Sequence, residues 1–154
     1  MAILNIVTKK DDEGFLRKKS REVTEITPRI HTLLDDMVET MRNANGCGLA
    51  AVQVGVLRRL VVIETEEGLF EFINPKIIAM SGSQKGDEGC LSVPGEWGTT
   101  VRPEHVTVRA LNRNGETVEV TGHGLLAKAM CHEIDHLDGI LYVDKVINET
   151  EDNK

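Results

Sequence analysis

The sequence predicts an α+β fold, in which antiparallel strands pack around a central helix and a second helix lies near the N-terminus. Three features predict it: an apolar repeat of helical spacing early in the chain, strand-like apolar runs between turn residues in the middle, and another helical repeat near the end. Helices that flank a block of strands, rather than alternating with single strands, are typical of α+β proteins. With 154 residues, the chain is expected to form one domain over residues 1–154.

The early helix is expected over residues 28–43. Thr27 can cap its first turn, and Pro28 suits the first helical position, where a missing N–H costs nothing. The pattern stops at Asn45-Gly46. The apolar residues that recur at helical spacing are Ile30, Leu33, Leu34, Met37, Val38 and Met41.

The middle of the chain is expected to be mostly strand. Residues 60–63 and 69–73 are predicted to form two strands joined by a turn at 66–68, and Asn74-Pro75 is expected to end the second. Residues 81–90 are rich in glycine and are expected to form a loop.

A hairpin is expected next. Residues 106–111 alternate as a half-buried strand does, Asn114-Gly115 favours a tight turn, and residues 117–120 are the returning strand.

The late helix has its own apolar repeat and its own stop signal. Gly139 is expected to end it in a left-handed cap, and the polar tail from Asn148 is expected to fray. The apolar residues of this helix are Leu125, Leu126, Ala129, Met130, Ile134 and Leu137.

Composition argues against several classes of protein. The formal net charge is −7, and the one basic run, at residues 17–21, has acidic residues on both sides, so a nucleic-acid or membrane-surface binder is not expected. The N-terminus lacks the pattern of a signal peptide, and no apolar run is long enough to cross a membrane. Three cysteines without a C-x-x-C pair make disulfides unlikely to form in the expected location, the cytoplasm, and leave thiols free for chemistry.

The late helix contains an H-E-x-x-H motif, His132-Glu133-Ile134-Asp135-His136. Residues four apart on a helix differ by about 40° around its axis, so both imidazoles leave one face and can bind one metal. Glu133 lies about 100° from His132, where it can hold a water on that metal as a general base. The alternative is a chance match between ordinary histidines, but the apolar neighbours predict burial, and buried ionisable groups need partners.

A catalytic site of this type needs a third ligand. Downstream candidates are poor, because Tyr142 occupies the position of a third histidine in the H-E-x-x-H-x-x-G-x-x-H pattern. Upstream, Cys90 lies in Glu88-Gly89-Cys90-Leu91-Ser92, where a glycine-containing loop could present a thiolate.

Three segments resemble, in order, the three motifs of the peptide deformylases. They are Gly46-Cys47-Gly48-Leu49-Ala50-Ala51-Val52-Gln53, Glu88-Gly89-Cys90-Leu91-Ser92 and His132-Glu133-Ile134-Asp135-His136-Leu137-Asp138-Gly139. One motif alone would be weak, but all three in this order are highly specific, and the similarity covers roughly residues 25–145.

The resemblance implies a metallohydrolase that removes the formyl group from the initiator formyl-methionine of new proteins. Cys90, His132 and His136 would bind the metal, which in the family is usually Fe2+, although Zn2+ or another divalent metal can substitute. Glu133 would move the proton from water to the leaving amine. Gln53 and the N–H of Leu91 would stabilise the oxyanion.

The resemblance also implies a substrate pocket and supporting charges. By family position, the pocket for the methionine side chain has Cys47, Leu125, Ala129 and Met130 as candidates; core packing is the alternative for Leu125 and Met130. Gly46 and Gly48 would also bind substrate, by letting the backbone pair with an extended peptide, or would be helix caps only. Glu88 and Arg102 would help to fix the cysteine loop, or would be unrelated surface charges.

The sequence departs from the family pattern in four places. Cys131 precedes His132 where glutamine is usual, and it points about 100° away from His132 on the helix, so it is not expected to be a ligand. Lys128 replaces a commonly apolar residue, and residues 9–14 replace a proline-containing segment. The tail from Asn148 is short and acidic, unlike the basic helix that meets the ribosome in some members, so that partner has only weak support.

Two rival functions stay open at this stage. A zinc peptidase could use the same helix, although the missing downstream ligand counts against it. A non-catalytic structural metal site would need a fourth protein ligand such as Cys131 or Cys47.

Overall fold

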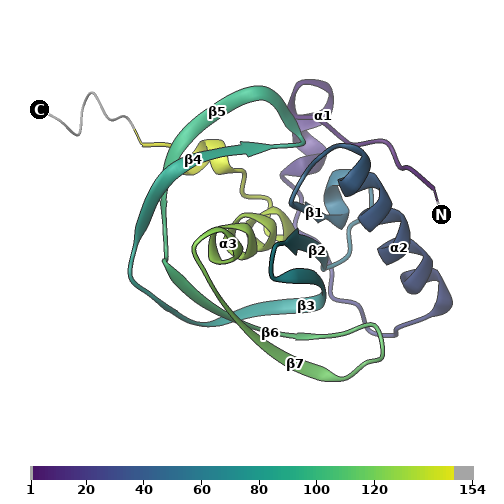
Figure 1. The fold of residues 1–154 in the computed structure, drawn as a ribbon. Coiled ribbons are helices and arrows are strands. Elements are labelled where there is room, and N and C mark those ends of the chain that lie inside the picture. The colour runs from purple at the N-terminus through teal and green to yellow at the C-terminus, as the bar shows by residue number, and fades with distance from the viewer. Residues whose placement is uncertain (1, 148–154) are drawn as a thin grey trace, which may run out of the picture.

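The computed structural model describes residues 2–147 and has an α+β architecture, as predicted (Figure 1). A five-stranded antiparallel sheet has the order β1-β2-β3-β6-β7, and β4 and β5 form a separate antiparallel pair. The strands are β1 (Gly48–Ala50), β2 (Leu60–Thr65), β3 (Gly68–Ser81), β4 (Gln84–Cys90), β5 (Val93–Arg102), β6 (His105–Leu111) and β7 (Thr117–His123). The helices are α1 (Lys9–Leu16), α2 (Pro28–Asn43) and α3 (Leu125–Leu137), with short 3-10 turns at Ala51–Val54 and Tyr142–Lys145.

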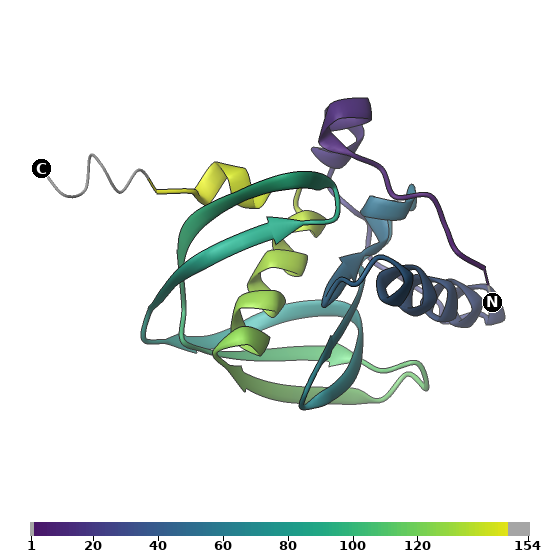
Figure 2. The ribbon, with the colours of Figure 1, turned by 45° about the horizontal axis from the view of Figure 1, so that its top comes forward.

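Helix α3 lies between the β4–β5 hairpin and the five-stranded sheet, whereas α2 lies at the other end of the molecule, beside β1 and β2 (Figures 1 and 2). Strand β2 serves both cores. Val61 and Ile63 belong to the apolar cluster around α3, and Leu60 and Val62 belong to the cluster around α2. Because successive side chains of a strand point to opposite faces, a strand buried on both faces needs a continuous apolar run, which residues 60–63 provide.

Both predicted helices are confirmed. The hydroxyl of Thr27 accepts a hydrogen bond from the N–H of Ile30 at 3.4 Å, which caps α2. Helix α3 ends at Leu137, and Gly139 follows with a φ of +77°. A Cβ at Gly139 would lie 2.2 Å from the carbonyl oxygen of Arg17, so close packing as well as the left-handed backbone requires glycine there.

Two predictions about the strands were wrong. Residues 84–90 are not a loop but strand β4, paired with β5. Asn74-Pro75 does not end a strand, because β3 continues to Ser81. The register shifts between Ile73 and Lys76, and Asn74 has a φ of +53°, so an irregularity of the pairing accommodates the proline.

The N-terminal segment contains a helix that the sequence did not reveal. Residues 9–14, the departure from the family pattern, belong to α1, which Thr8 caps by accepting a hydrogen bond from the N–H of Asp11. The preceding chain reaches the centre of the molecule, where the N–H of Val7 donates to the carbonyl of Gln53 at 2.7 Å. The predicted hairpin of β6 and β7 is confirmed, and the tail from Asn148 lies outside the described residues. Among residues 2–147, no helix is long and apolar enough to cross a membrane.

Candidate metal centre

Cys90, His132 and His136 converge, although 42 positions separate the cysteine from the nearer histidine in the sequence. Each offers one ligand atom, and the three atoms lie within 4.8 Å of one another. The Sγ of Cys90 is 3.3 Å from Nε2 of His136. Cys90 ends β4 and both histidines lie on α3, so the packing of the hairpin against this helix assembles the group. Within residues 2–147, neither Cys47 nor Cys131 belongs to it, and three ligands leave a position for water or substrate.

A buried carboxylate fixes the ring of His132. Oε1 of Glu88 lies 2.7 Å from Nδ1 of His132, so an Nδ1–H can donate to it and leave Nε2 free to bind a metal. The ring of Tyr142 stacks on His132 with centroids 6.0 Å apart, and the Tyr142 hydroxyl donates to the carbonyl of Glu96. The imidazole is therefore held at one nitrogen and at one face.

Glu88 is held in turn by Arg102. Nε and Nη2 of Arg102 donate to the two carboxylate oxygens of Glu88 at 2.7 and 2.9 Å, and the hydroxyl of Thr100 donates to the same carboxylate. Both charged side chains are 3% exposed. Burial opposes ionisation of Glu88, but the hydrogen bonds from His132, Arg102 and Thr100 outweigh it and hold the pKa of this carboxyl well below its ordinary value. Arg102 also donates to Asp135 at 2.8 Å, so it ties β5 to α3.

The two histidines differ in their electrostatic surroundings. Burial lowers the pKa of His136, and the positive charges of His132 and Arg102 lower it further, so its imidazole is neutral and available as a ligand. Burial also opposes protonation of His132, but Glu133, Cys90 and Glu88 together raise its pKa well above the ordinary value. A metal that binds Nε2 must therefore displace a proton from His132.

Glu133 is buried beside the histidines. Its residue is 4% exposed, and burial is the main cause that raises the pKa of its carboxyl to about 7. One oxygen, Oε1, is buried and has no hydrogen-bond partner. Oε2 lies 3.9 Å from Nε2 of His132, next to the ligand atoms. A buried acceptor without a protein partner, at this position, fits a water held between the carboxylate and a metal.

Gly48 makes room for that carboxylate. A Cβ at this position would lie 2.6 Å from Oε2 of Glu133, a distance that side chains essentially never show. The small residue is required because β1 passes directly over the carboxylate end of Glu133.

The amide of Gln53 has a single orientation. Oε1 accepts a hydrogen bond from the N–H of Ala50 at 2.9 Å, and Nε2 donates to the hydroxyl of Ser92 at 3.0 Å. Nε2 also lies 3.6 Å from Sγ of Cys90. Gln53 is 1% exposed, so its amide is buried and is not a surface group.

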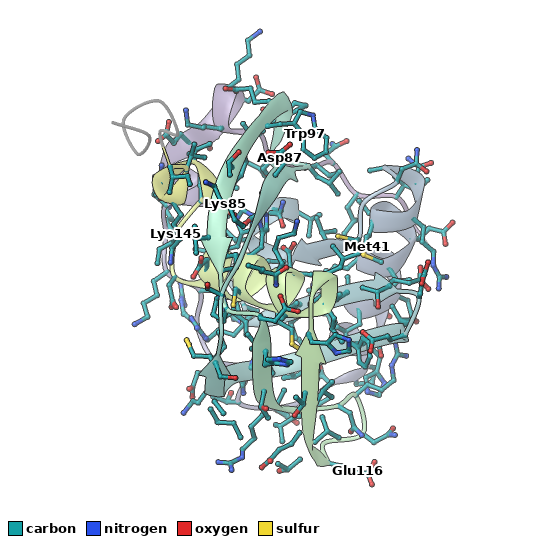
Figure 3. The ribbon with its side chains drawn as sticks, turned by 60° about the vertical axis from the view of Figure 1, so that its left-hand side comes forward. Met41, Lys85, Asp87, Trp97, Glu116 and Lys145 are labelled. Carbon is teal, nitrogen blue, oxygen red and sulfur yellow. The ribbon has the colours of Figure 1, made fainter. Side chains whose placement is uncertain are left out.

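A cavity of about 450 Å³ opens in front of these groups. Five of the residues predicted to bind substrate line it: Gly46, Cys47, Gly48, Leu125 and Ala129. Met130 does not line it and is instead fully buried in the apolar cluster around α3. Leu91, Trp97 and Lys128 also line the cavity, and Figure 3 shows Trp97 and Asp87 on the β4–β5 hairpin.

Sequence reasoning missed four residues of the site. Ser92 orients Gln53, Tyr142 stacks on His132, Asp135 binds Arg102, and Trp97 covers Gly89, where a Cβ would lie 2.7 Å from the indole. Ser92 and Asp135 stand inside the recognised motifs, so they could have been suspected. Tyr142 and Trp97 carry no sequence signal, because their roles come from packing alone.

Comparisons with known proteins identify a family for this chain. The family described as Polypeptide deformylase matches residues 3–152. A peptide deformylase of Alkaliphilus metalliredigens is 59% identical over 97% of this chain and 100% of its own length. The crystal structure of a peptide deformylase from Thermotoga maritima has a TM-score of 0.91 at 33% identity, and covers 96% of this chain and 100% of that one. A peptide deformylase from Ehrlichia chaffeensis in complex with actinonin has the same TM-score at 40% identity, covering 99% of this chain and 94% of that one.

Proposed function

The chain belongs to the polypeptide deformylase family, and from that premise we propose that Cys90, His132 and His136 bind the metal of this hydrolase. Its reaction is that of the family: it removes the N-formyl group from the formyl-methionine that begins a new protein chain, and releases formate. The observation that carries the assignment of ligands is the convergence of one sulfur and two ring nitrogens within 4.8 Å. Thiolate and imidazole suit both Fe2+ and Zn2+, and Fe2+ is proposed because the resemblance implies it.

The chain's own residues divide the chemistry between them. A divalent metal bound by the three ligands would supply Lewis acidity, which makes water a nucleophile near neutral pH. Glu133 takes a proton from that water while the water oxygen attacks the formyl carbon. The same carboxyl then delivers the proton to the peptide nitrogen as the C–N bond breaks. The products are formate and a peptide with a free amino terminus.

The negative charge that develops on the formyl oxygen needs donors. The side-chain amide of Gln53 and the N–H of Leu91 are proposed for this role. Two observations support Gln53: the bonds of its amide to Ala50 and Ser92 fix its direction, and its Nε2 is close to Cys90. Donors fixed before the reaction stabilise the transition state without reorganising.

The methionine side chain is proposed to lie against Cys47, Leu125 and Ala129, and the backbone of Gly46 and Gly48 is proposed to pair with the extended peptide. All five residues line the cavity beside the ligand atoms. Glu88 and Arg102 are proposed to act on the reaction through His132, because Glu88 contacts Nδ1 of that ring and Arg102 holds Glu88.

The wider setting is also a proposal. Residues 1–154 are proposed to form one catalytic domain, supported by the family match over residues 3–152 and by the packing of α3 against strands of both sheets. The substrates are nascent N-formylmethionyl peptides, so the cytoplasm is the expected place of action. A contact with the ribosome would have to use a surface other than the tail, because Glu149, Glu151 and Asp152 would repel RNA phosphates.

Formate release from a formyl-methionyl peptide by protein loaded anaerobically with Fe2+ tests the proposal, with Glu133→Gln as the variant. We expect the variant to retain metal but to lose turnover by about 10²-fold or more, as is usual for a general acid–base group. Activity near wild type would remove Glu133 from its role. Cleavage of peptides with a free amino terminus would instead favour a peptidase.

A further inference from the structure

We propose that His105 and His123 form a second metal site, which binds Cu2+ or Ni2+ on the surface of the five-stranded sheet. Both histidines are exposed, and they lie directly opposite each other on β6 and β7. Neither takes part in the reaction described above, so the inference does not depend on the proposed function.

The two histidines occupy the kind of cross-strand position that brings side chains closest. Opposite residues of an antiparallel pair alternate between hydrogen-bonded and non-hydrogen-bonded positions, and the Cα atoms of the latter are closer, at about 4.5 Å. The N–H of Gly124 donates to the carbonyl of Glu104 at 3.1 Å, so the neighbouring position is hydrogen-bonded. His105 and His123 are therefore at a non-hydrogen-bonded position, with both side chains on the same face of the sheet.

Other residues on this face show that side chains meet across β6 and β7. The hydroxyls of Thr107 and Thr121 lie 2.8 Å apart, and Nη2 of Arg109 lies 2.9 Å from a carboxylate oxygen of Glu119. The two threonines are directly opposite each other, as are Arg109 and Glu119. The pair next to the histidines is thus uncharged, and the charges of the following pair balance each other.

This face of the sheet is turned away from α3. Val106 and Val108 alternate along β6 with the side chains of the exposed face, and both belong to the apolar cluster around α3. Figure 2 shows α3 on one side of β6 and β7, so His105 and His123 lie on the other side. A cation bound between them is outside the substrate cavity, which neither histidine lines.

The two rings are close enough to share one cation after a small rotation. Their centroids are 6.1 Å apart. The centroids of His132 and His136, the proposed ligands of the catalytic metal, are 5.0 Å apart. The rings of the surface pair must approach by about 1 Å to reach the same separation. Exposed side chains reorient on the picosecond to nanosecond timescale, so this approach is available to them.

The ring nitrogens of the pair are not engaged with other groups. Among residues 2–147, the structure has no hydrogen bond or ion pair from the imidazole of His105 or His123. Nε2 of His31, by contrast, lies 2.6 Å from the carbonyl oxygen of Arg113. A cation can therefore bind the pair without breaking an existing bond, and the net charge of −7 favours its approach.

The donor set indicates which cations fit. Imidazole nitrogen suits Cu2+, Ni2+ and Zn2+, and Cu2+ and Ni2+ also accept a tetragonal geometry of nitrogen and oxygen ligands, in which water fills the remaining positions. Zinc sites generally use three or four protein ligands. Within the part of the chain that the structure describes, no third cysteine, histidine or carboxylate completes a cluster with the pair, so Cu2+ and Ni2+ are favoured.

Equilibrium dialysis with Ni2+ tests the site, in protein already loaded with one equivalent of Ni2+. We expect wild type to bind a further equivalent. His105→Gln and His123→Gln should each raise the Kd of that equivalent by about 10²-fold, because the second ring binds a cation that the first already holds nearby. The double variant should lose little more than either single variant, since the rings act as one unit. Excess Ni2+ should raise the Tm of wild type but not of the variants, because only the folded sheet brings the rings together.

Glu119→Gln is the matched control, because it removes an exposed carboxylate from the same face of β7 and should leave the further equivalent in place. Without excess Ni2+, the histidine variants should match wild type in Tm and in formate release, since both side chains are exposed and outside the cavity. Absence of a further equivalent in wild type, or its retention in either single variant, would overturn the inference. Loss of half the binding in each single variant would also overturn it, because the rings would then bind separate ions.

Discussion

Replacing Glu88 by glutamine should destabilise the protein and weaken its metal site at the same time. The substitution keeps the shape of the side chain but removes the charge that two N–H groups of Arg102, the hydroxyl of Thr100 and Nδ1 of His132 all face. An amide has one acceptor oxygen, and its NH2 group would point at donors. Arg102, which is 3% exposed, then keeps Asp135 as its one charged partner.

The magnitude follows from that burial. Breaking a buried ion pair by removing one partner costs about 3–5 kcal/mol. The remaining bond from Arg102 to Asp135 at 2.8 Å places the expected loss near the lower end, about 3 kcal/mol of unfolding free energy. For a domain of this size, that lowers Tm by about 6–12 °C. Loss of the acceptor for His132 should weaken metal binding by about 10–100-fold.

The pH dependence of the loss has a defined sign. Since the pKa of Glu88 lies well below its ordinary value of 4.5 in the folded protein, its ionised form stabilises the fold fully above pH 4.5. This contribution is lost as the pH falls from 4.5 toward the folded-state pKa. The difference between wild type and Glu88→Gln should therefore be largest between about pH 4.5 and 6.5 and shrink in acid. It should also shrink as the pH rises above 6.5, because Glu88 helps to raise the pKa of His132 in the metal-free protein.

Urea unfolding of the metal-free protein and competition with a chelator for Zn2+ measure the two effects separately. Glu119→Gln is the matched control, because the pair of Arg109 and Glu119 also joins two strands at 2.9 Å but is about half exposed, and should contribute less than about 1 kcal/mol. A loss in Glu88→Gln no larger than in the control, with unchanged Zn2+ affinity, would refute the reasoning.

Three further predictions follow from contacts in the site. Gly48→Ala should lower kcat by about tenfold or more with metal retained, because the new methyl group must displace the Glu133 carboxylate; steady-state kinetics with metal analysis checks it, and unchanged kcat contradicts it. Ser92→Ala should lower kcat by several-fold, because the Gln53 amide loses the acceptor that orients it. Ser92→Thr keeps a hydroxyl for that bond and should lower kcat less, whereas equal losses of kcat in the two variants would point to packing. A bulky thiol reagent should label Cys47, which is exposed in the cavity wall, and block activity; burial and the charge of Glu133 raise the pKa of this thiol, so labelling should speed up as the pH rises. Cys131, which is 6% exposed and whose pKa burial raises to about 11, should stay unlabelled, and mass spectrometry of the folded protein distinguishes the two.

Local sequence patterns determined the elements whose signals repeat within a few residues. The apolar spacing and caps of α2 and α3, and the Asn114-Gly115 turn between β6 and β7, were readable because each depends on neighbours along the chain. Helix geometry alone placed His132 and His136 on one face of α3. The choice of Cys90 as the third ligand depends on the order of the three motifs. Its position beside the histidines depends on the packing of the β4–β5 hairpin against α3.

Only the tertiary structure decided how distant groups support one another. The glycines of β4 lack strand propensity, so the sequence predicts a loop there, and the strand exists through its pairing with β5. The bonds that hold His132 through Glu88, and Gln53 through Ser92, join residues 44 and 39 positions apart. Spacing along the chain fixes directions within one helix or turn, whereas contacts between elements depend on how the whole chain packs, which no local pattern encodes.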